Sequence, residues 1–274
     1  MFIQPVPHPR LKENAITKLP ISVPIIACNE ARNLPRVLGS VHEWVSEIVV
    51  VLNNTSDDSA VIARGFGARI EHHAWLGYRD TKNAALGFVT QPWVLALDAD
   101  EEVSPALREE IFTFFRGDDS RFAGASFPRK VFFLGRWIMH GDWYPDRSLR
   151  LFRLDAARWA GSPEHDKVEI NGEVKKLSAD LHHFSNPTIS SHVGKINTFA
   201  DYFLQRQIEN GKRWSGWQTV SRPVWRFFRA YILRRGFLDG FPGFYIAYAT
   251  AFATFIRYSR LYEYRVNHPQ AGTD

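Results

Sequence analysis

Apolar and polar positions follow two alternating periods between residues 20 and 115, and this alternation predicts strands and helices in turn. Three short apolar runs are each typical of a buried strand: residues 21–27, 47–52 and 93–97. Helical spacing of apolar residues separates them, at residues 33–45, around Val61 and Ile62, and at residues 81–89. A further short strand is expected at residues 68–71. Such a chain is expected to form a parallel sheet with helices on both faces.

Turn and capping residues support these helix ends. Asp57 or Asp58 can cap the second helix, and Gly65 or Gly67 can end it. After the third apolar run, Ser104 is expected to cap a further helix that has Pro105 in its first turn.

Polar clusters follow all three long strands. They comprise residues 28–30, 53–58 and 98–100. Ligands of open α/β sheets bind outside the carboxyl ends of the strands, so these clusters are the first candidates for a site.

Asp98 and Asp100, in the third of these clusters, are the residues best suited to bind a metal ion. Side chains alternate along an extended strand, so the two carboxylates are expected on one side, with Ala99 pointing away. Oxygen ligands of this kind select Mg²⁺ or Mn²⁺, and the cation can hold a diphosphate. The alternative is a solvated acidic turn that leads into the helix capped by Ser104.

Composition limits the class of protein. With 274 residues, of which 45% are hydrophobic and 23% charged, the chain can bury one large core, or one core and an appendage. A single cysteine, Cys28, excludes an internal disulfide framework. The first residues lack the pattern of a signal peptide, so a cytoplasmic location is expected. The apolar stretch at 240–256 falls short of the roughly 20 residues that span a bilayer.

Several motifs resemble those of a known family, the family 2 glycosyltransferases, in the branch that includes lipopolysaccharide core glucosyltransferases. They lie at residues 25–34, 47–51, 75–83, 97–104, 143–153, 163–168 and 234–240. The resemblance covers residues 20–265. It implies a Rossmann-like, mostly parallel sheet of the nucleotide-diphospho-sugar transferase type (GT-A), with a helical carboxyl-terminal extension. In the second cluster, residues 52–57 (Leu-Asn-Asn-Thr-Ser-Asp) replace the Asp-rich loop that is usual in the family.

The resemblance also implies an inverting transfer from a nucleotide-diphosphate sugar such as UDP-glucose to a lipopolysaccharide core or other envelope glycan. A cation neutralises the leaving diphosphate, and Asp100 and Asp98 are the expected ligands, with His165 as a third ligand or an orienting partner. A general base must also take the proton of the acceptor hydroxyl. The family motif places this acid at Asp166, and Glu164 is the second candidate. A charged surface turn is the alternative reading of this motif.

Further residues are expected around the substrates. Donor binding is assigned to Ala27, Asn29, Glu30, Asn53, Asn54, Lys82 and Asp98. Acceptor binding is assigned to Trp143, Tyr144 and Arg150, in a loop where an aromatic ring can stack on a sugar and Arg150 can pair with phosphate. Helix caps, exposed charges and ordinary packing are the alternatives. His182, His183 and His192 lack the spacing of a zinc site and are expected to be structural.

The carboxyl-terminal third differs in composition. Between Arg206 and Gly236 there are eight Lys or Arg residues and one acidic residue, Glu209, interleaved with aromatic residues. This pattern favours an anionic membrane surface, met through residues 206–256. Nucleic acid is not expected, because no recognition motif is present. Packing against a sister subunit is the other possibility for the apolar helix at 244–256.

The sequence therefore predicts a transferase of four parts: an N-terminal tail at 1–19, a nucleotide-sugar-binding catalytic domain at 20–185, a helical acceptor and membrane-docking region at 186–265, and a tail at 266–274. It is expected to act as a peripheral protein on the inner face of the cell membrane. A non-catalytic scaffold of the same fold is one alternative. A sugar nucleotidyltransferase is another, although the Gly-rich phosphate loop of that class does not follow the first strand.

Overall fold

The computed structural model describes residues 18–117, 121–162, 165–185 and 188–268, without the side chains of residues 162, 165 and 166. The chain forms two compact units, and each is made of segments that are not consecutive in the sequence. The first contains the chain up to Phe127, with Leu149–Ala160 and Lys167–Asp180. The second contains Pro128–Ser148, Gly161–Asp166 and the chain from Leu181 onward. The domain boundaries expected at 20, 186 and 266 stay a prediction.

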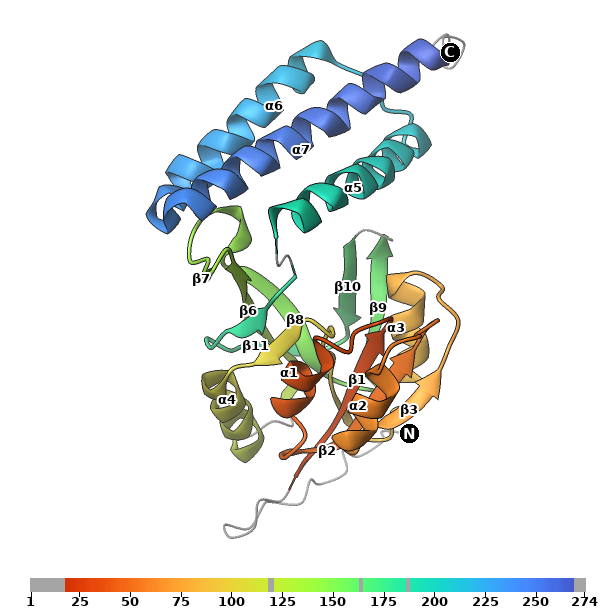
Figure 1. The fold of residues 1–274 in the computed structure, drawn as a ribbon. Helices are drawn as coiled ribbons and strands as arrows, with labels where there is room; N and C mark the ends of the chain where they lie inside the picture. The colour runs from red at the N-terminus through yellow and green to blue at the C-terminus, as the bar shows by residue number, and fades with distance from the viewer. Residues whose placement is uncertain (1–17, 118–120, 163–164, 186–187, 269–274) are drawn as a thin grey trace. The chain divides into compact units, whose positions relative to one another are not determined.

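Four parallel strands form the middle of the first unit: β1 (Leu19–Ala27), β2 (Val45–Leu52), β3 (Arg69–His72) and β4 (Trp93–Leu95). They lie in the order β3-β2-β1-β4 (Figure 1). The order reverses at β1, so the carboxyl ends of β1 and β4 flank a topological switch point, where open α/β sheets bind ligands. On the far side of β4, β8 (Asp146–Arg153) runs antiparallel and β6 (Phe122–Phe133) follows it.

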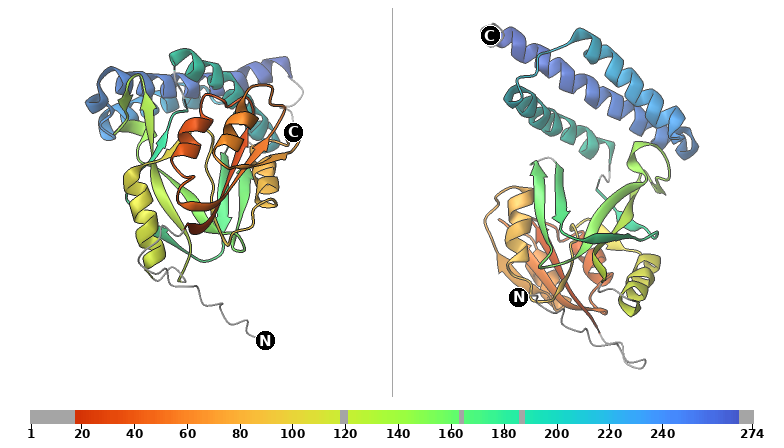
Figure 2. Two further views of the ribbon diagram at one scale, coloured as in Figure 1. Left: turned by 60° about the horizontal axis from the view of Figure 1, so that its bottom comes forward. Right: turned by 180° about the vertical axis from the view of Figure 1, so that it is seen from behind.

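Helices cover both faces of this sheet, as the alternating pattern predicted. α1 (Leu34–Gly39) and α2 (Ser59–Gly65) lie on one face, and α3 (Tyr78–Leu86) lies on the other (Figures 1 and 2). Ala85 of α3 packs in a buried cluster with Val49 and Val51 of β2. The predicted α/β class with a mostly parallel sheet is confirmed.

Shorter elements complete the first unit. They are β5 (Glu101–Val103), α4 (Pro105–Arg116), β9 (Ala157–Ser162), its hairpin partner β10 (His165–Ile170), and β11 (Glu173–Lys176), which pairs with β6. The predicted cap of α4 is confirmed, because Ser104 Oγ accepts a hydrogen bond from Leu107 N at 3.1 Å.

Several predicted boundaries are shifted; the helix expected at 81–89, for example, spans Tyr78–Leu86. The helix expected at 33–45 ends at Gly39. Trp44 is buried, and its carbonyl oxygen accepts a hydrogen bond from Leu19 N of β1 at 2.8 Å, so residues near Trp44 bond to the sheet and cannot continue the helix. The strand expected to reach residue 97 ends at Leu95.

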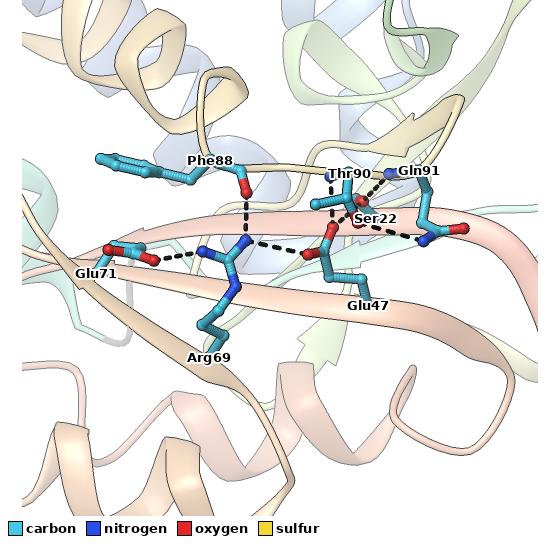
Figure 3. A network of polar contacts seen from close by, with 7 residues as sticks. All are labelled: Ser22, Glu47, Arg69, Glu71, Phe88, Thr90 and Gln91. Carbon is cyan, nitrogen blue, oxygen red and sulfur yellow. Dashed lines mark hydrogen bonds and ion pairs between the residues drawn. The ribbon is translucent and has the colours of Figure 1, made fainter.

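A polar network ties β1, β2 and β3 to the loop before β4, near the amino ends of the strands (Figure 3). The buried Ser22 hydroxyl donates to Glu47 Oε2, and Thr90 N donates to the same oxygen at 2.8 Å. Arg69 Nη2 donates to Glu47 Oε1 at 3.0 Å. Burial alone would raise the pKa of Glu47, but the hydrogen bonds from Ser22, Thr90 and Arg69 outweigh it and lower that pKa. Charged Glu47 therefore stabilises this part of the sheet.

In the second unit, the continuation of β6 pairs with β7 (Arg136–Trp137) and β12 (Leu181–His183). A helical part follows, with α5 (Ile189–Glu209), α6 (Gly216–Phe228), a π-helical turn η3 (Arg229–Leu233), a 3₁₀ turn η4 (Gly236–Asp239) and α7 (Gly240–Asn267). α7 packs against both α5 and α6 (Figures 1 and 2). The predicted helical extension is confirmed, and the apolar segment at 244–256 is the first half of α7.

Two glycines allow the tight passage from α6 into α7. A Cβ atom on Gly243 would lie 1.9 Å from the Gly236 carbonyl oxygen, and one on Gly236 would lie 2.7 Å from the Ala230 carbonyl oxygen. Both neighbours are backbone atoms that cannot turn away, so a side chain at either position would push the helices apart.

Buried carboxylates fasten the loop after β7 to these helices. Asp142, in the 3₁₀ turn η2 (Gly141–Trp143), pairs at 2.9–3.4 Å with Arg226, Arg229 and Arg234. Asp239 accepts hydrogen bonds from Met139 N at 3.0 Å and His140 N at 2.8 Å. Among the described residues, no helix has the length and apolar content needed to cross a membrane.

Candidate active site

The acidic segment after β4 is a closed turn and not the extended strand that the sequence predicted. Glu101 N donates to Asp98 O at 3.0 Å, and the Glu101 side chain accepts a hydrogen bond from Asp98 N at 2.9 Å. The buried Glu101 carboxylate thus bends the chain back, and Asp100 lies half-buried within the turn. The alternation argument for Asp98 and Asp100 does not apply here.

Arg150 of β8 lies beneath this turn. It is 3% exposed, and its Nη2 atom lies 2.5 Å from Asp98 Oδ2 and 2.9 Å from Glu101 Oε1. A buried charge is tolerated when it is paired and hydrogen-bonded, so this arginine and the two carboxylates depend on one another.

Lys82 of α3 contacts the other carboxylate oxygen of Asp98. Its Nζ atom lies 2.7 Å from Asp98 Oδ1 and 4.4 Å from the centre of the Trp159 ring, an arrangement that adds a cation–π contact. Lys82 and Arg150 thus balance the charges of Asp98 and Glu101. Lys82, a predicted donor ligand, is engaged with another predicted site residue.

Asn83 holds Trp159 in place. Its Nδ2 donates to Trp159 O and its Oδ1 accepts from Trp159 N, both at 2.9 Å. The Asn83 side chain therefore makes two hydrogen bonds to the backbone of β9, and these hold Trp159 in position next to Lys82.

A small pocket of about 10 Å³, roughly the space of one water molecule, borders this network and opens to solvent. Its apolar lining includes Ile26 of β1 and Leu97, and its polar lining includes Lys82, Asp98 and Arg150. It lies at the β1–β4 switch point, so fold topology and side-chain chemistry single out the same place.

The loops after β1 and β2 are joined by hydrogen bonds. Asn29, with φ of 56°, accepts from Ser56 N at 2.8 Å, and Glu30 N donates to Ser59 Oγ at 2.9 Å. Asp57 accepts from Ser59 Oγ and from Ala31 N. The hydroxyl of Ser59, and then these backbone amides, lower the pKa of Asp57. The two polar clusters therefore form one surface.

Among the predicted donor residues, Ala27 and Asn53 serve the structure of this surface. The Ala27 carbonyl accepts from Asn53 N at 3.0 Å, and Asn53, which is buried, donates through Nδ2 to His73 O at 3.1 Å. Asn54 is exposed and has φ of 43°, a left-handed conformation that asparagine tolerates. Ala27, Asn29, Glu30, Asn53 and Asn54 all stay predictions for donor binding.

The carboxylates fit a cation that binds together with a diphosphate. Both oxygens of Asp98 already lie near a cation, as described above. Within the side chains that the structure describes, no group of three or more His, Cys, Asp and Glu residues is arranged to hold a metal ion. Mg²⁺ is often held by one or two carboxylates, with substrate phosphates and water completing its shell. Asp100 and Asp98, two residues apart in the chain, stay the predicted ligands of such a cation.

The predicted general bases are not tested by the structure. Glu164 lies outside the described residues, and His165 and Asp166 are described in backbone only, at the start of β10. Their predicted roles stay predictions.

The predicted acceptor residues belong to different units. Arg150 is part of the first unit, whereas Trp143 and Tyr144 are part of the second. The Trp143 ring packs 5.3 Å from Phe133 and 5.2 Å from His192 (between ring centres). Burial, and then Lys195, lower the pKa of His192, whose Nδ1 lies 3.0 Å from Tyr245 Oη. His192 is thus structural, as predicted.

Sequence reasoning missed Glu101 and Trp159. Glu101 is completely buried, yet it stands in a run of acidic residues that reads as a solvated turn. Trp159 is nearly buried in β9 without a motif of its own. A weak signal existed for Glu101 alone: it lies three residues after Asp98, the spacing at which a carboxylate can accept from a backbone amide across a turn.

Comparisons with known proteins agree with this geometry. The model of the family described as Glycosyl transferase family 2 matches residues 22–169. A glycosyltransferase of Rickettsia felis, itself uncharacterised, is 32% identical over 260 residues, which cover 89% of each chain. The lipopolysaccharide core biosynthesis glycosyltransferase LpsC of Rhizobium meliloti is 28% identical over 255 residues, covering 90% of this chain and 94% of LpsC.

Among solved structures, residues 1–349 of S. aureus TarS in complex with UDP-GlcNAc are 13% identical, with a TM-score of 0.46, covering 90% of this chain and 92% of that one. The family assignment rests on the sequence matches alone. The family model spans more than half of the chain, including β1, β4, the Asp98–Glu101 turn and Arg150. The chain is a glycosyltransferase that belongs to glycosyl transferase family 2.

Proposed function

We propose that this enzyme transfers a sugar, with inversion, from a nucleotide-diphosphate donor to a glycan acceptor of the cell envelope. The observation that carries the proposal is the turn at the β1–β4 switch point, where Asp100 stands beside an Asp98 carboxylate that Lys82 and Arg150 fix in place. A rigid, pre-organised carboxylate turn suits a reaction in which charge develops on a leaving diphosphate.

Asp100, with Asp98 beside it, would hold Mg²⁺ or Mn²⁺. When bound, the cation neutralises charge on the leaving diphosphate. Lys82 would orient Asp98 and add positive charge on the same side of the pocket. Asn29, Glu30 and Asn54, on the joined loops after β1 and β2, would contact the nucleoside.

Asp166 would act as the general base, with Glu164 as the second candidate and His165 as an orienting partner or metal ligand. The base takes the proton from the acceptor hydroxyl as its oxygen attacks the anomeric carbon from the face opposite the diphosphate. One displacement of this kind inverts the anomeric configuration. Trp143 and Tyr144 would contribute to acceptor binding.

The name of one relative supports the choice of acceptor class. LpsC is named for lipopolysaccharide core biosynthesis and matches nearly the whole chain. We therefore assign the acceptor to the lipopolysaccharide core or a related envelope glycan, and the donor to UDP-glucose or a related nucleotide sugar. Such acceptors are lipid-linked, so we place the enzyme as a peripheral protein on the inner membrane face, docked through residues 206–256.

Calorimetric titration with UDP, and then with GDP, tests the donor half of the proposal. UDP should bind in the presence of Mn²⁺ and bind much more weakly without it. Asp100→Ala should abolish the metal-dependent part, whereas Asp155→Ala, which removes an exposed carboxylate of the same unit, should leave it unchanged. Binding of neither nucleotide would favour a non-catalytic scaffold, and metal-independent binding would remove the role given to Asp100.

A further inference from the structure

α6 exposes a stripe of large apolar side chains. Trp217, Val220, Val224 and Phe228 are three or four residues apart and so share one face of the helix. Trp217 is 79% exposed and Val224 65% exposed, far more than ordinary core-facing positions. An apolar face of this extent marks an interaction surface.

α7 carries a matching stripe. Phe241, Phe244, Tyr248, Phe252 and Phe255 are again three or four residues apart, and their exposed fractions lie between 42% and 65%. The opposite side of the same helix is buried. α7 thus has two apolar sides, of which the folded chain covers one.

The two stripes face the same side of the helix pair. The helices are antiparallel, because Phe227 packs on Phe244 at the start of α7 whereas Trp214 packs on Tyr262 near its end. When each helix is followed along the chain, its stripe extends up to about a quarter of a turn beyond the residue that contacts the other helix, which is Phe227 on α6 and Phe244 on α7. Since the helices run in opposite directions, these rotations bring both stripes to one side, with Phe227 and Phe244 at the seam.

The charge along these helices is positive, although Asp142 pairs with Arg226, Arg229 and Arg234, and Asp201 pairs with Arg260. From Lys212 to Arg260 there are nine Lys or Arg residues and a single acidic residue, Asp239. Asp239 is 1% exposed and bound by backbone amides, so it offers little negative charge to the surface. Exposed basic side chains stand at both ends of the α6 stripe: Lys212, Arg213, Arg234 and Arg235.

We propose that the stripes of α6 and α7, named here the aromatic face, lie flat in the headgroup layer of an anionic lipid bilayer. Aromatic rings suit this layer, and the basic side chains at its ends meet lipid phosphates. A second copy of the chain fits less well, because two positively charged faces would oppose each other. The inference deepens the proposed membrane acceptor and rests on that part of the proposed function.

Vesicle flotation tests the aromatic face. The full chain should float with vesicles of phosphatidylcholine and phosphatidylglycerol, and much less with phosphatidylcholine alone. The variant Trp217→Ser/Phe252→Ser should lose at least about tenfold in partitioning, because it removes two inserted rings. Both side chains are exposed, so the fold should persist. The matched control, Val61→Ser/Leu76→Ser, changes two equally exposed apolar residues of the first unit and should bind as wild type.

A second variant tests the charges. Lys212→Gln/Arg235→Gln should weaken binding to the anionic vesicles by about fivefold per charge and leave the weak binding to neutral vesicles unchanged. Wild-type partitioning of the Trp217→Ser/Phe252→Ser variant would overturn the proposal. The proposal would also be overturned if the wild-type protein formed a dimer in solution, did not bind vesicles, and became a monomer in the Trp217→Ser/Phe252→Ser variant. UDP titration of the same variants reports on the transferase separately, since neither pair lies in the donor site.

Discussion

Arg150 Nη2 lies 2.5 Å from Asp98 Oδ2, although the two residues are 52 positions apart in the chain. The same nitrogen serves Glu101, so the cation that fixes the candidate metal turn also compensates a completely buried carboxylate. Site geometry and fold stability therefore depend on one side chain.

Arg150→Met should lower the free energy of unfolding at pH 7 by about 3–5 kcal/mol, because it removes the cation that pairs with the buried Glu101 carboxylate. Urea unfolding measures this change. The control is Arg121→Met, which removes a mostly exposed pair with Glu173 and should cost far less. An equal loss of free energy of unfolding in the two variants would show that the buried pair stabilises the fold no more than the exposed pair does.

Asn83→Asp should destabilise the fold by about 1–3 kcal/mol, since a carboxylate can accept from Trp159 N but cannot donate to Trp159 O. It should also lower affinity for UDP, because Trp159 would no longer be held against Lys82. Thermal unfolding and nucleotide titration give the two readouts. Unchanged UDP affinity at full folding would remove Trp159 from the donor site.

Glu47→Gln should lower stability at pH 7 by about 1–2 kcal/mol, through loss of hydrogen bonds to a charged acceptor. The pKa of Glu47 is lowered in the folded state from its ordinary value of 4.5. Its contribution is therefore complete above pH 4.5 and is lost as the pH falls through the lower folded value. Wild type and variant should converge in acid when unfolding is followed against pH. The control Glu43→Gln, at an exposed side chain, should have little effect on stability at pH 7.

Asp166→Asn should leave UDP affinity in the presence of Mn²⁺ unchanged and lower the transfer rate by about 10²–10⁴-fold, because a general base acts in the transition state. Glu164→Gln, measured beside it, should retain most activity. The reverse order of effects would assign the general base to Glu164. Normal turnover in both variants would show that neither carboxylate is the general base.

The order of strands and helices could be predicted because it depends on local periodicity, and the Ser104 cap because it depends on neighbouring residues. The Asp98–Glu101 turn could not. Its hydrogen bonds are local, but they depend on a buried Glu101 carboxylate whose charge is balanced by Arg150, 49 positions away, and local pattern contains no information on that pairing. The extended arrangement predicted for Asp98 and Asp100 failed for this reason.

The helical part shows the same limit. Apolar content predicted a helix at 244–256, but only packing reveals which side of α7 the chain covers. Gly236 and Gly243 have no signal of their own in the sequence, whereas in the fold they permit a close backbone crossing.

The closed turn at Asp98 also restricts motion. Its amide donates to a carboxylate that is fully buried, so this turn cannot open unless Glu101 leaves the core. Amide hydrogen exchange at Asp98 should then require opening of the surrounding sheet, at a rate close to that of β4. Any movement that admits donor and releases product must arise in other segments, which makes the acidic turn the fixed reference point of the catalytic cycle.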